Sequence, residues 1–161
     1  MPTYFITGAE GVGKTSIVPF LRNHFLTYSV HDFDDVGVPK NPHPNWRLET
    51  MQYWIHGALE NQNEGKTTIL IGLCFPSEFE KCKDNNLIDI PNFCLLDVSK
   101  QTRAKRLTKS KRKKLISDIQ QWNLLREEFD GLKHVHTVIN TSKQNVIQTA
   151  QSVIDWIEES L

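Results

Sequence analysis

The chain has 161 residues, of which 39% are hydrophobic, so it fits one domain with a single core over residues 1–161. Its 19 basic and 19 acidic side chains cancel, and eight of the basic ones are confined to residues 103–114. A nucleic-acid surface would spread such charges over a face, so this class of partner is not expected. Three cysteines without a C-x-x-C pair argue against a disulfide scaffold and a structural zinc site. With no basic leader and no run of 18 apolar residues, we expect a cytoplasmic protein without a membrane span.

Residues 4–26 combine a short apolar strand, a glycine-rich loop and an amphipathic helix. The loop fits the pattern G-x-x-x-x-G-K-[ST] through Gly8, Gly13, Lys14 and Thr15. Its glycines let successive N–H groups point inward at an anion, and the positive end of the following helix adds to this attraction. Lys14 is expected to reach the β- and γ-phosphates, and the hydroxyl of Thr15 to ligate Mg²⁺. The loop is the most specific signal in the chain, and it predicts a nucleoside triphosphate site.

The chain continues with a short strand, a loop and a helix. Residues 28–32 are partly β-branched and end in acidic side chains, which indicates a second strand. Residues 36–45 hold three prolines and are predicted to be a loop, whereas apolar residues at the helical period predict a helix over 46–61. The apolar run 67–75 predicts a strand buried on both faces, which Pro76 ends.

The second half of the chain alternates in the same way. We expect an irregular segment at 77–91, a buried strand at 92–98, a helix capped by Ser99, a long helix from Leu115 to a break at Gly131, a strand at 134–139 and a final helix at 146–161. Strands separated by helices predict an α/β fold with a parallel sheet covered on both faces. In such a sheet, ligands bind beyond the carboxyl ends of the strands, which selects residues 8–15, 32–35, 72–77, 97–106 and 140–143.

Three of these segments together resemble the small P-loop kinases, the superfamily that contains nucleoside monophosphate kinases and shikimate kinase. They are the loop at 8–15, Asp-x-Asp at 32–34 and Leu-Asp-Val-Ser-x-x-x-Arg-x-x-Arg-Leu at 96–107. The resemblance implies a three-layer α/β/α fold with a five-stranded parallel sheet in the order 2-3-1-4-5. It also implies an acceptor-side segment at about 36–65, a basic lid at about 103–116, and a kinase that uses ATP and Mg²⁺ to phosphorylate a small molecule. An anionic or nucleotide-like acceptor is one option.

The resemblance implies roles for particular residues. The catalytic candidates are Lys14, Asp32, Asp34, Arg103 and Arg106. The nucleotide-binding candidates are Gly8, Glu10, Gly11, Val12, Gly13, Lys14, Thr15, Ser16, Arg103 and Ser142. The candidates for binding the acceptor are Asp34, Trp46, Arg47 and Gly72, and those for the metal are Thr15, Asp32 and Asp97. From its chemistry alone, the planar fork of Arg47 could bind an anionic group.

Several alternatives stay open. Asp97 ends an apolar strand and so competes with Asp32 for the metal. Residues 34–37 fit the D-x-x-G pattern of GTPases, but no [NT]-K-x-D pattern follows them, which argues against a GTPase. Residues 72–76 match neither the Gly-Tyr-Pro-Arg of monophosphate kinases nor the glycine triplet of shikimate kinase. The alternative to a kinase is therefore a nucleotide-binding regulatory module that does not transfer phosphate.

Overall fold

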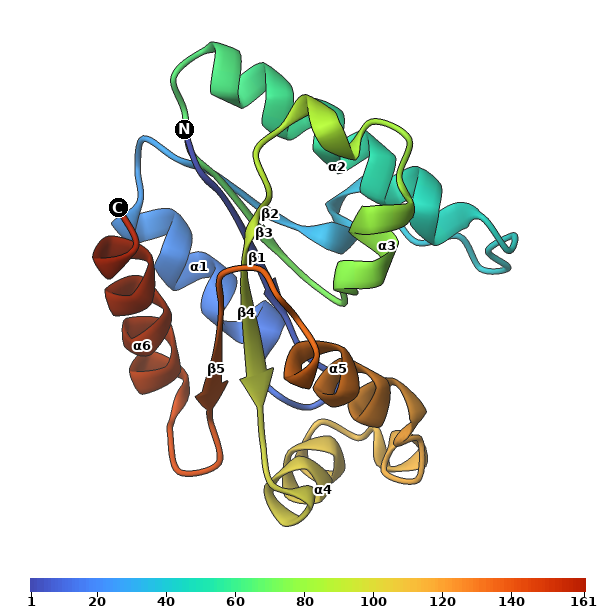
Figure 1. Ribbon diagram of the computed structural model, residues 1–161. Coiled ribbons are helices and arrows are strands. Elements are labelled where there is room, and N and C mark those ends of the chain that lie inside the picture. The colour runs from blue at the N-terminus through green and yellow to red at the C-terminus, as the bar shows by residue number, and fades with distance from the viewer.

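The computed structural model describes residues 1–161 as one alternating series of strands and helices (Figure 1). The strands are β1 Thr3–Thr7, β2 Ser29–Asp32, β3 Thr68–Ile71, β4 Asn92–Asp97 and β5 His136–Asn140. The helices are α1 Lys14–His24, α2 Trp46–Asn63, α3 Pro76–Lys81, α4 Lys100–Lys109, α5 Gln120–Asp130 and α6 Val146–Glu159. Short 3-10 turns lie at Phe33–Val36, Asn85–Leu87 and Lys113–Leu115.

The five strands form one parallel sheet in the order β2-β3-β1-β4-β5, which confirms the expected order. In this register Asp32, the last residue of β2, lies opposite Ile71. Asp97, the last residue of β4, lies opposite Asn140. The carboxyl ends of all five strands therefore share one edge, where the loop after β1 also lies.

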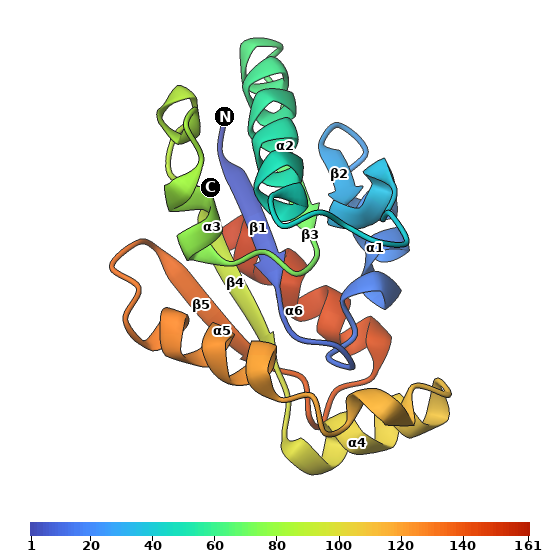
Figure 2. The same ribbon diagram turned by 90° about the vertical axis from the view of Figure 1, so that its right-hand side faces the viewer.

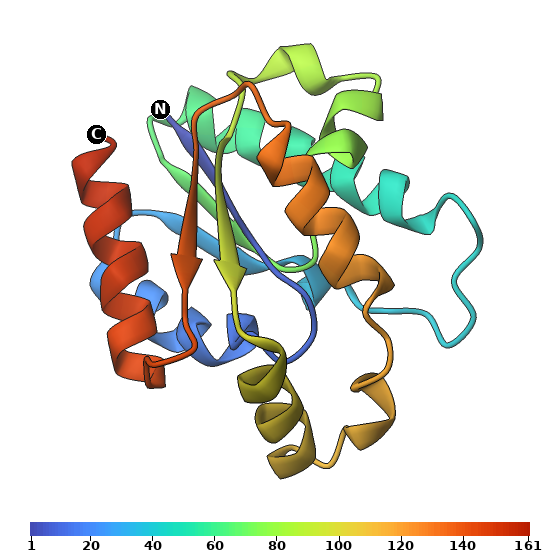
Figure 3. The same cartoon turned by 60° about the horizontal axis from the view of Figure 1, so that its bottom comes forward.

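Helices cover both faces of the sheet and make two separate cores (Figures 1 and 2). Helices α1 and α6 pack on one face around the fully buried residues Ile6, Ile17, Leu21, Ile71, Val153 and Ile157. Helices α2, α3 and α5 pack on the other face around Phe5, Met51, Ile55, Leu70, Phe93 and Leu125. Helix α4 lies beyond the carboxyl end of β4 (Figure 3). None of the helices is both long and apolar enough to cross a lipid bilayer.

The strand predicted at 67–75 is shorter than expected, because β3 ends at Ile71. The chain then leaves the sheet, and the backbone N–H of Cys74 donates to Thr7 Oγ1 at 3.0 Å. The apolar residues that follow β3 are core residues in a loop, not in a strand. Pro76 is the first residue of helix α3, which extends to Lys81 into the segment 77–91 that was predicted to be irregular. The Glu78 side chain accepts from the Phe75 N–H at the start of this helix.

The long helix predicted from Leu115 begins only at Gln120. Arg103 lies against the segment before it, where its guanidinium donates to the carbonyl oxygens of Leu115, Ile116 and Asp118 at 2.9–3.1 Å. The Leu115 carbonyl also accepts from the backbone N–H of Asp118 at 3.2 Å, three residues on, as in a tight turn. The segment therefore makes a 3-10 turn and an irregular bend before α5 starts.

Replacement by alanine is expected to change the stability of the protein in opposite directions at two glycines. A Cβ on Gly72 would lie 2.3 Å from the Cβ of Phe33, so Gly72→Ala is expected to lower the free energy of unfolding by about 2 kcal/mol or more. Gly57 lies inside α2 with no heavy atom within 4 Å of such a Cβ, so Gly57→Ala is expected to raise it by about 0.5–1 kcal/mol. Urea unfolding of both variants measures this, and effects of the same sign would contradict it.

Candidate active site

The loop after β1 curls in the way that its glycines allow. Gly11 and Gly13 have φ values of 87° and 104°, in the left-handed region that side chains avoid. Gly13 immediately precedes α1, so the loop runs directly into the positive end of that helix. Gly8 packs so closely on Val12 and the carbonyl of Leu96 that a Cβ would lie within 2.7 Å of both. The loop thus has the curled shape and the helix end that suit an anion.

Lys14 and Thr15 occupy the inner side of this loop. The Lys14 ammonium donates to the carbonyl of Ala9 at 2.9 Å, which folds the side chain back over the loop. Burial lowers the pKa of Lys14, although the charges of Glu10 and Asp32 partly oppose this. The hydroxyl of Thr15 donates to Asp32 Oδ2 at 3.5 Å, which links the loop to the end of β2.

A small cavity of about 110 Å³ lies between the loop and the ends of β2 and β3. Its lining comprises Glu10, Gly11, Gly13, Lys14, Thr15, Ser16, Asp32, Asp34, Gly72, Leu73 and Arg112. The structure therefore brings the Asp-x-Asp pair and the loop lysine of the sequence prediction together around one space.

The two aspartates are fixed by the 3-10 turn that follows β2. Asp32 Oδ1 accepts from the backbone N–H of Asp34 at 3.0 Å, and the Asp32 N–H donates to Asp35 Oδ2 at 3.0 Å. Burial raises the pKa of Asp34, and the neighbouring charge of Asp32 raises it further. A carboxylate with a raised pKa at the edge of a cavity is suited to accept a proton.

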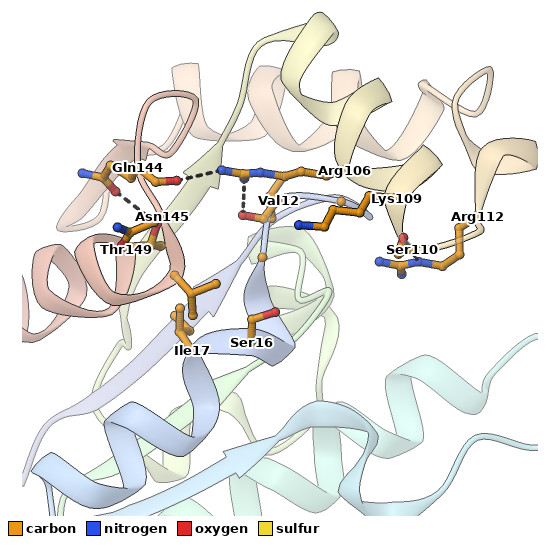
Figure 4. A pocket seen from close by; sticks show the side chains of 13 residues that line it. Val12, Ser16, Ile17, Arg106, Lys109, Ser110, Arg112, Gln144, Asn145 and Thr149 are labelled. Atoms are coloured by element: carbon orange, nitrogen blue, oxygen red, sulfur yellow. Dashed lines mark hydrogen bonds between the residues drawn. The ribbon is translucent and has the colours of Figure 1, made fainter.

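A second, larger cavity of about 480 Å³ lies between the loop, α4 and the start of α6 (Figure 4). Its lining comprises Gly11, Val12, Gly13, Ser16, Ile17, Arg106, Lys109, Ser110, Arg112, Gln144, Asn145, Val146 and Thr149. Four residues also line the small cavity: Gly11, Gly13, Ser16 and Arg112. The two cavities therefore meet at the glycine-rich loop.

Arg103 and Arg106 share a face of α4, as their spacing predicts, but this face turns toward backbone carbonyls. Arg103 is only 3% exposed and donates to the carbonyl of Glu10 at 2.9 Å, in addition to its three bonds before α5. Arg106 donates to the carbonyls of Val12 and Gln144 at 3.0 and 3.1 Å (Figure 4). It also donates to the carbonyl of Thr141 at 2.7 Å. Both arginines thereby hold the glycine-rich loop in shape, and each makes four hydrogen bonds within the protein from its five N–H donors.

Arg112 is the residue that the sequence analysis missed. Its Nη1 lies 2.6 Å from Glu10 Oε2, both side chains are about half exposed, and Arg112 borders both cavities. It follows Lys111, whose φ of 59° is the only positive value at a residue other than glycine. The basic run 103–114 was the available signal, but the run alone does not distinguish Arg112 from its neighbours.

Asp97 lies apart from the other two metal candidates. Its carboxylate accepts from Trp122 Nε1 at 2.9 Å and from Arg126 Nε at 3.0 Å, both on α5. The guanidinium of Arg126 lies 4.9 Å from the ring centroid of Trp122, so Asp97, Trp122 and Arg126 all contact one another. Asp97 does not line the small cavity, whereas Thr15 and Asp32 do.

The remaining candidates have polar or packing partners. Arg47 is paired with Glu78 on α3, and Trp46 packs its edge on Phe33 with ring centroids 6.4 Å apart. Ser142 lies in the loop after β5, and its Oγ accepts from the backbone N–H of Ser99 at 2.7 Å. This bond joins the loop after β5 to the start of α4, and neither serine lines the larger cavity.

The oxygen atoms of Thr15 and Asp32 fit a magnesium site. No three His, Cys, Asp or Glu side chains are grouped to hold a metal by themselves. Mg²⁺ in phosphoryl-transfer sites needs only one or two protein oxygens, because substrate phosphates and water supply the others. A hydroxyl and a carboxylate 3.5 Å apart at the loop meet that requirement.

No family model matches the chain, and no curated protein matches it. Solved structures match over nearly its whole length. A sugar kinase from a Janibacter species has a TM-score of 0.65 at 15% identity, covering 98% of this chain and 95% of its own. The APS kinase of Mycobacterium tuberculosis, in complex with AMPPNP and APS, scores 0.62 at 15% identity with 98% and 97% covered. Shikimate kinase from Acinetobacter baumannii, in complex with shikimate, scores 0.55 at 16% identity with 99% and 94% covered. The chain thus has the fold of the small P-loop kinases.

Proposed function

We propose that this protein transfers the γ-phosphoryl group of ATP to a hydroxyl group of a small molecule. The proposal rests on two cavities of unequal size that meet at the glycine-rich loop. The larger one, of about 480 Å³, would take the nucleoside, and the smaller one would take the γ-phosphate and the reacting end of the acceptor. A protein that only bound a nucleotide would not need a second, carboxylate-lined space beyond the phosphates. The similarity in fold to sugar, APS and shikimate kinases supports this proposal.

Five side chains would act on the reacting groups. Lys14 and Arg112 neutralise the negative charge that spreads over the phosphate oxygens during transfer. Thr15 and Asp32 would hold Mg²⁺, which when bound neutralises the phosphates of the donor. Asp34 orients the acceptor hydroxyl and takes its proton. Arg103 and Arg106 position the glycine-rich loop through their hydrogen bonds to its carbonyls.

Incubation of the purified protein with Mg²⁺-ATP and a cell metabolite extract tests the proposal. Mass spectrometry should find a species that gains one phosphate group only when protein and ATP are both present. The Asp34→Asn variant is the matched control, because it changes the acceptor side and leaves the glycine-rich loop intact. ATP binding without any phosphorylated species would contradict the proposal.

The pH dependence follows from Asp34. Because burial and Asp32 raise its pKa, kcat/KM is expected to fall on the acid side at a pH above that of an ordinary aspartate. The base must be unprotonated, so activity is present above this pKa and lost as the pH falls through it. Asp34→Asn should lower kcat about 10²-fold and remove this acid limb. Rates measured over about pH 4–8 check both points, and a limb that persists in the variant would exclude Asp34 as the base.

One observation favours a second candidate function, a regulatory module that responds to ATP. The Glu10–Arg112 ion pair lines the small cavity, Arg112 also lines the larger one, and a bound triphosphate would compete with Glu10 for Arg112. Nucleotide binding would then release the basic segment without any transfer of phosphate. Tight ATP binding with altered proteolysis of residues 110–119, but no phosphorylated product, would favour this candidate over a kinase.

A further inference from the structure

Arg47 is held in a closed ion pair at the start of the acceptor-side helix α2. Its Nε and Nη2 donate to the two carboxylate oxygens of Glu78 at 2.6 and 2.8 Å, and Nη2 also donates to the carbonyl of Leu73. The guanidinium lies 5.5 and 5.7 Å from the ring centroids of Phe33 and Phe75. Arg47 was predicted from the sequence to bind an anionic acceptor, but its charge is neutralised by Glu78 within the protein.

An incoming anion would have to displace Glu78 in order to accept from Nε and Nη2 of Arg47, the two atoms that now donate to Glu78. The Glu78 side chain is only 16% exposed, so displacement would leave a largely buried carboxylate without its cation. Burial by itself lowers the pKa of Arg47, yet the hydrogen bonds and the charge of Glu78 raise it above its ordinary value. The pair with Glu78 thus holds Arg47 in its charged form, and the pair resists opening.

The small cavity has more carboxylates than cations. Its lining includes two cations, Lys14 and Arg112, and three carboxylates, Glu10, Asp32 and Asp34. Once a triphosphate with its Mg²⁺ takes both cations and Asp32, the acceptor faces Glu10, Asp34 and the γ-phosphate. A negatively charged acceptor would be repelled by all of these groups at short range, in a partly buried space where water screens poorly.

The other basic side chains of residues 36–65 do not reverse this balance. His43 Nε2 lies 3.2 Å from Glu49 Oε2, and His56 Nε2 lies 2.8 Å from Asp84 Oδ2. Lys40 lies in the exposed loop and does not line the small cavity. The acceptor side therefore offers no uncompensated cation next to the reacting hydroxyl.

We infer that the acceptor is a small alcohol without net negative charge, such as an uncharged polyol, a nucleoside or an amino alcohol. This inference rests on the proposed function, because it names the acceptor of the same site. In the reaction, the acceptor oxygen forms a bond to the γ-phosphorus while the bond from that phosphorus to the β–γ bridging oxygen breaks. ADP leaves with the electron pair of that bond, and the hydroxyl proton passes to Asp34.

Fractionation of the metabolite extract tests the inference. Anion-exchange chromatography at neutral pH separates neutral and cationic molecules, which flow through, from retained anions. Each fraction is incubated with the protein and Mg²⁺-ATP, and species that gain a phosphate are identified by mass spectrometry. We expect the acceptor in the flow-through fraction, and an acceptor found in the retained fraction would overturn the inference while leaving the proposed kinase intact. If neither fraction gains phosphate, both are overturned.

The variant Glu78→Gln tests the role of the ion pair directly. Glutamine keeps an acceptor oxygen for the helix start but removes the charge that neutralises Arg47. We expect the ratio of rates with retained anions to rates with flow-through molecules to rise about tenfold. Glu128→Gln is the matched control, because Glu128 contacts the neighbouring Ser77 N–H and Oγ and pairs with no arginine. An unchanged ratio in Glu78→Gln, or the same rise in both variants, would overturn the inference.

Discussion

Replacement of Lys14 by methionine is expected to lower kcat/KM for phosphate transfer by about 10³-fold or more. The Lys14 ammonium is the only cation that lies inside the glycine-rich loop, where it donates to the carbonyl of Ala9. Methionine keeps the length of the side chain and removes the charge. Because the charge acts on the γ-phosphate during transfer, the loss should appear mainly in kcat, which steady-state kinetics with the identified acceptor measures.

Lys105→Met is the control for this prediction, since Lys105 is an exposed residue of α4 and lines neither cavity. It should keep wild-type kinetics. Thermal unfolding should give similar Tm values for both variants and the wild type. If Lys14→Met turned over ATP as fast as the wild type, the glycine-rich loop would not be the phosphate site.

Replacement of Arg103 by methionine is expected to lower mainly the stability of the protein, and replacement of Arg112 is expected to lower mainly kcat. Arg103→Met removes four hydrogen bonds to backbone carbonyls, so the free energy of unfolding should fall by about 3 kcal/mol and Tm by roughly 6–12 °C. Arg112→Met removes one half-exposed ion pair, worth about 0–1 kcal/mol, so Tm should change by no more than roughly 4 °C. Its kcat should nevertheless fall by about 10²-fold.

Calorimetry and steady-state kinetics on the same preparations separate these two roles. The double variant Glu10→Gln, Arg112→Met tests whether kcat falls because Arg112 no longer contacts the phosphates or because its ion pair with Glu10 is lost. If Arg112 acts on the phosphates, the double variant should be as slow as Arg112→Met alone. A stable Arg103→Met variant with low kcat would assign the phosphate role to Arg103 instead.

The alternation of strands and helices and the position of the glycine-rich loop could be predicted from the sequence because both depend on local patterns, whereas the order of the strands followed only from the resemblance to the small P-loop kinases. Apolar runs, helical periods and one motif are readable without tertiary information. The end of β3 was predicted wrongly, since residues 73–75 are apolar for core packing in a loop, and hydrophobicity alone does not separate the two. Pro76 was interpreted as a stop, but a proline is equally suited to the first turn of a helix.

The arginines of α4 show why the site was harder to predict than the fold. Their spacing correctly places Arg103 and Arg106 on one helix face. The partners of that face are backbone carbonyl oxygens of distant segments. Because every residue has a carbonyl, the sequence does not indicate which ones bind the arginines. The same holds for Arg47, whose partner Glu78 comes from a helix that the sequence did not predict.

The hydrogen bonds of Arg106 also have a consequence for folding. Arg106 joins the carbonyl of Val12 to those of Thr141 and Gln144, although Val12 precedes Arg106 by 94 residues. The shape of the glycine-rich loop thus depends on contacts between segments that are far apart in the sequence, and loop-closure entropy opposes such contacts during folding. This loop is therefore expected to reach its final shape late in folding, after β5 and α6 have packed on the rest of the sheet.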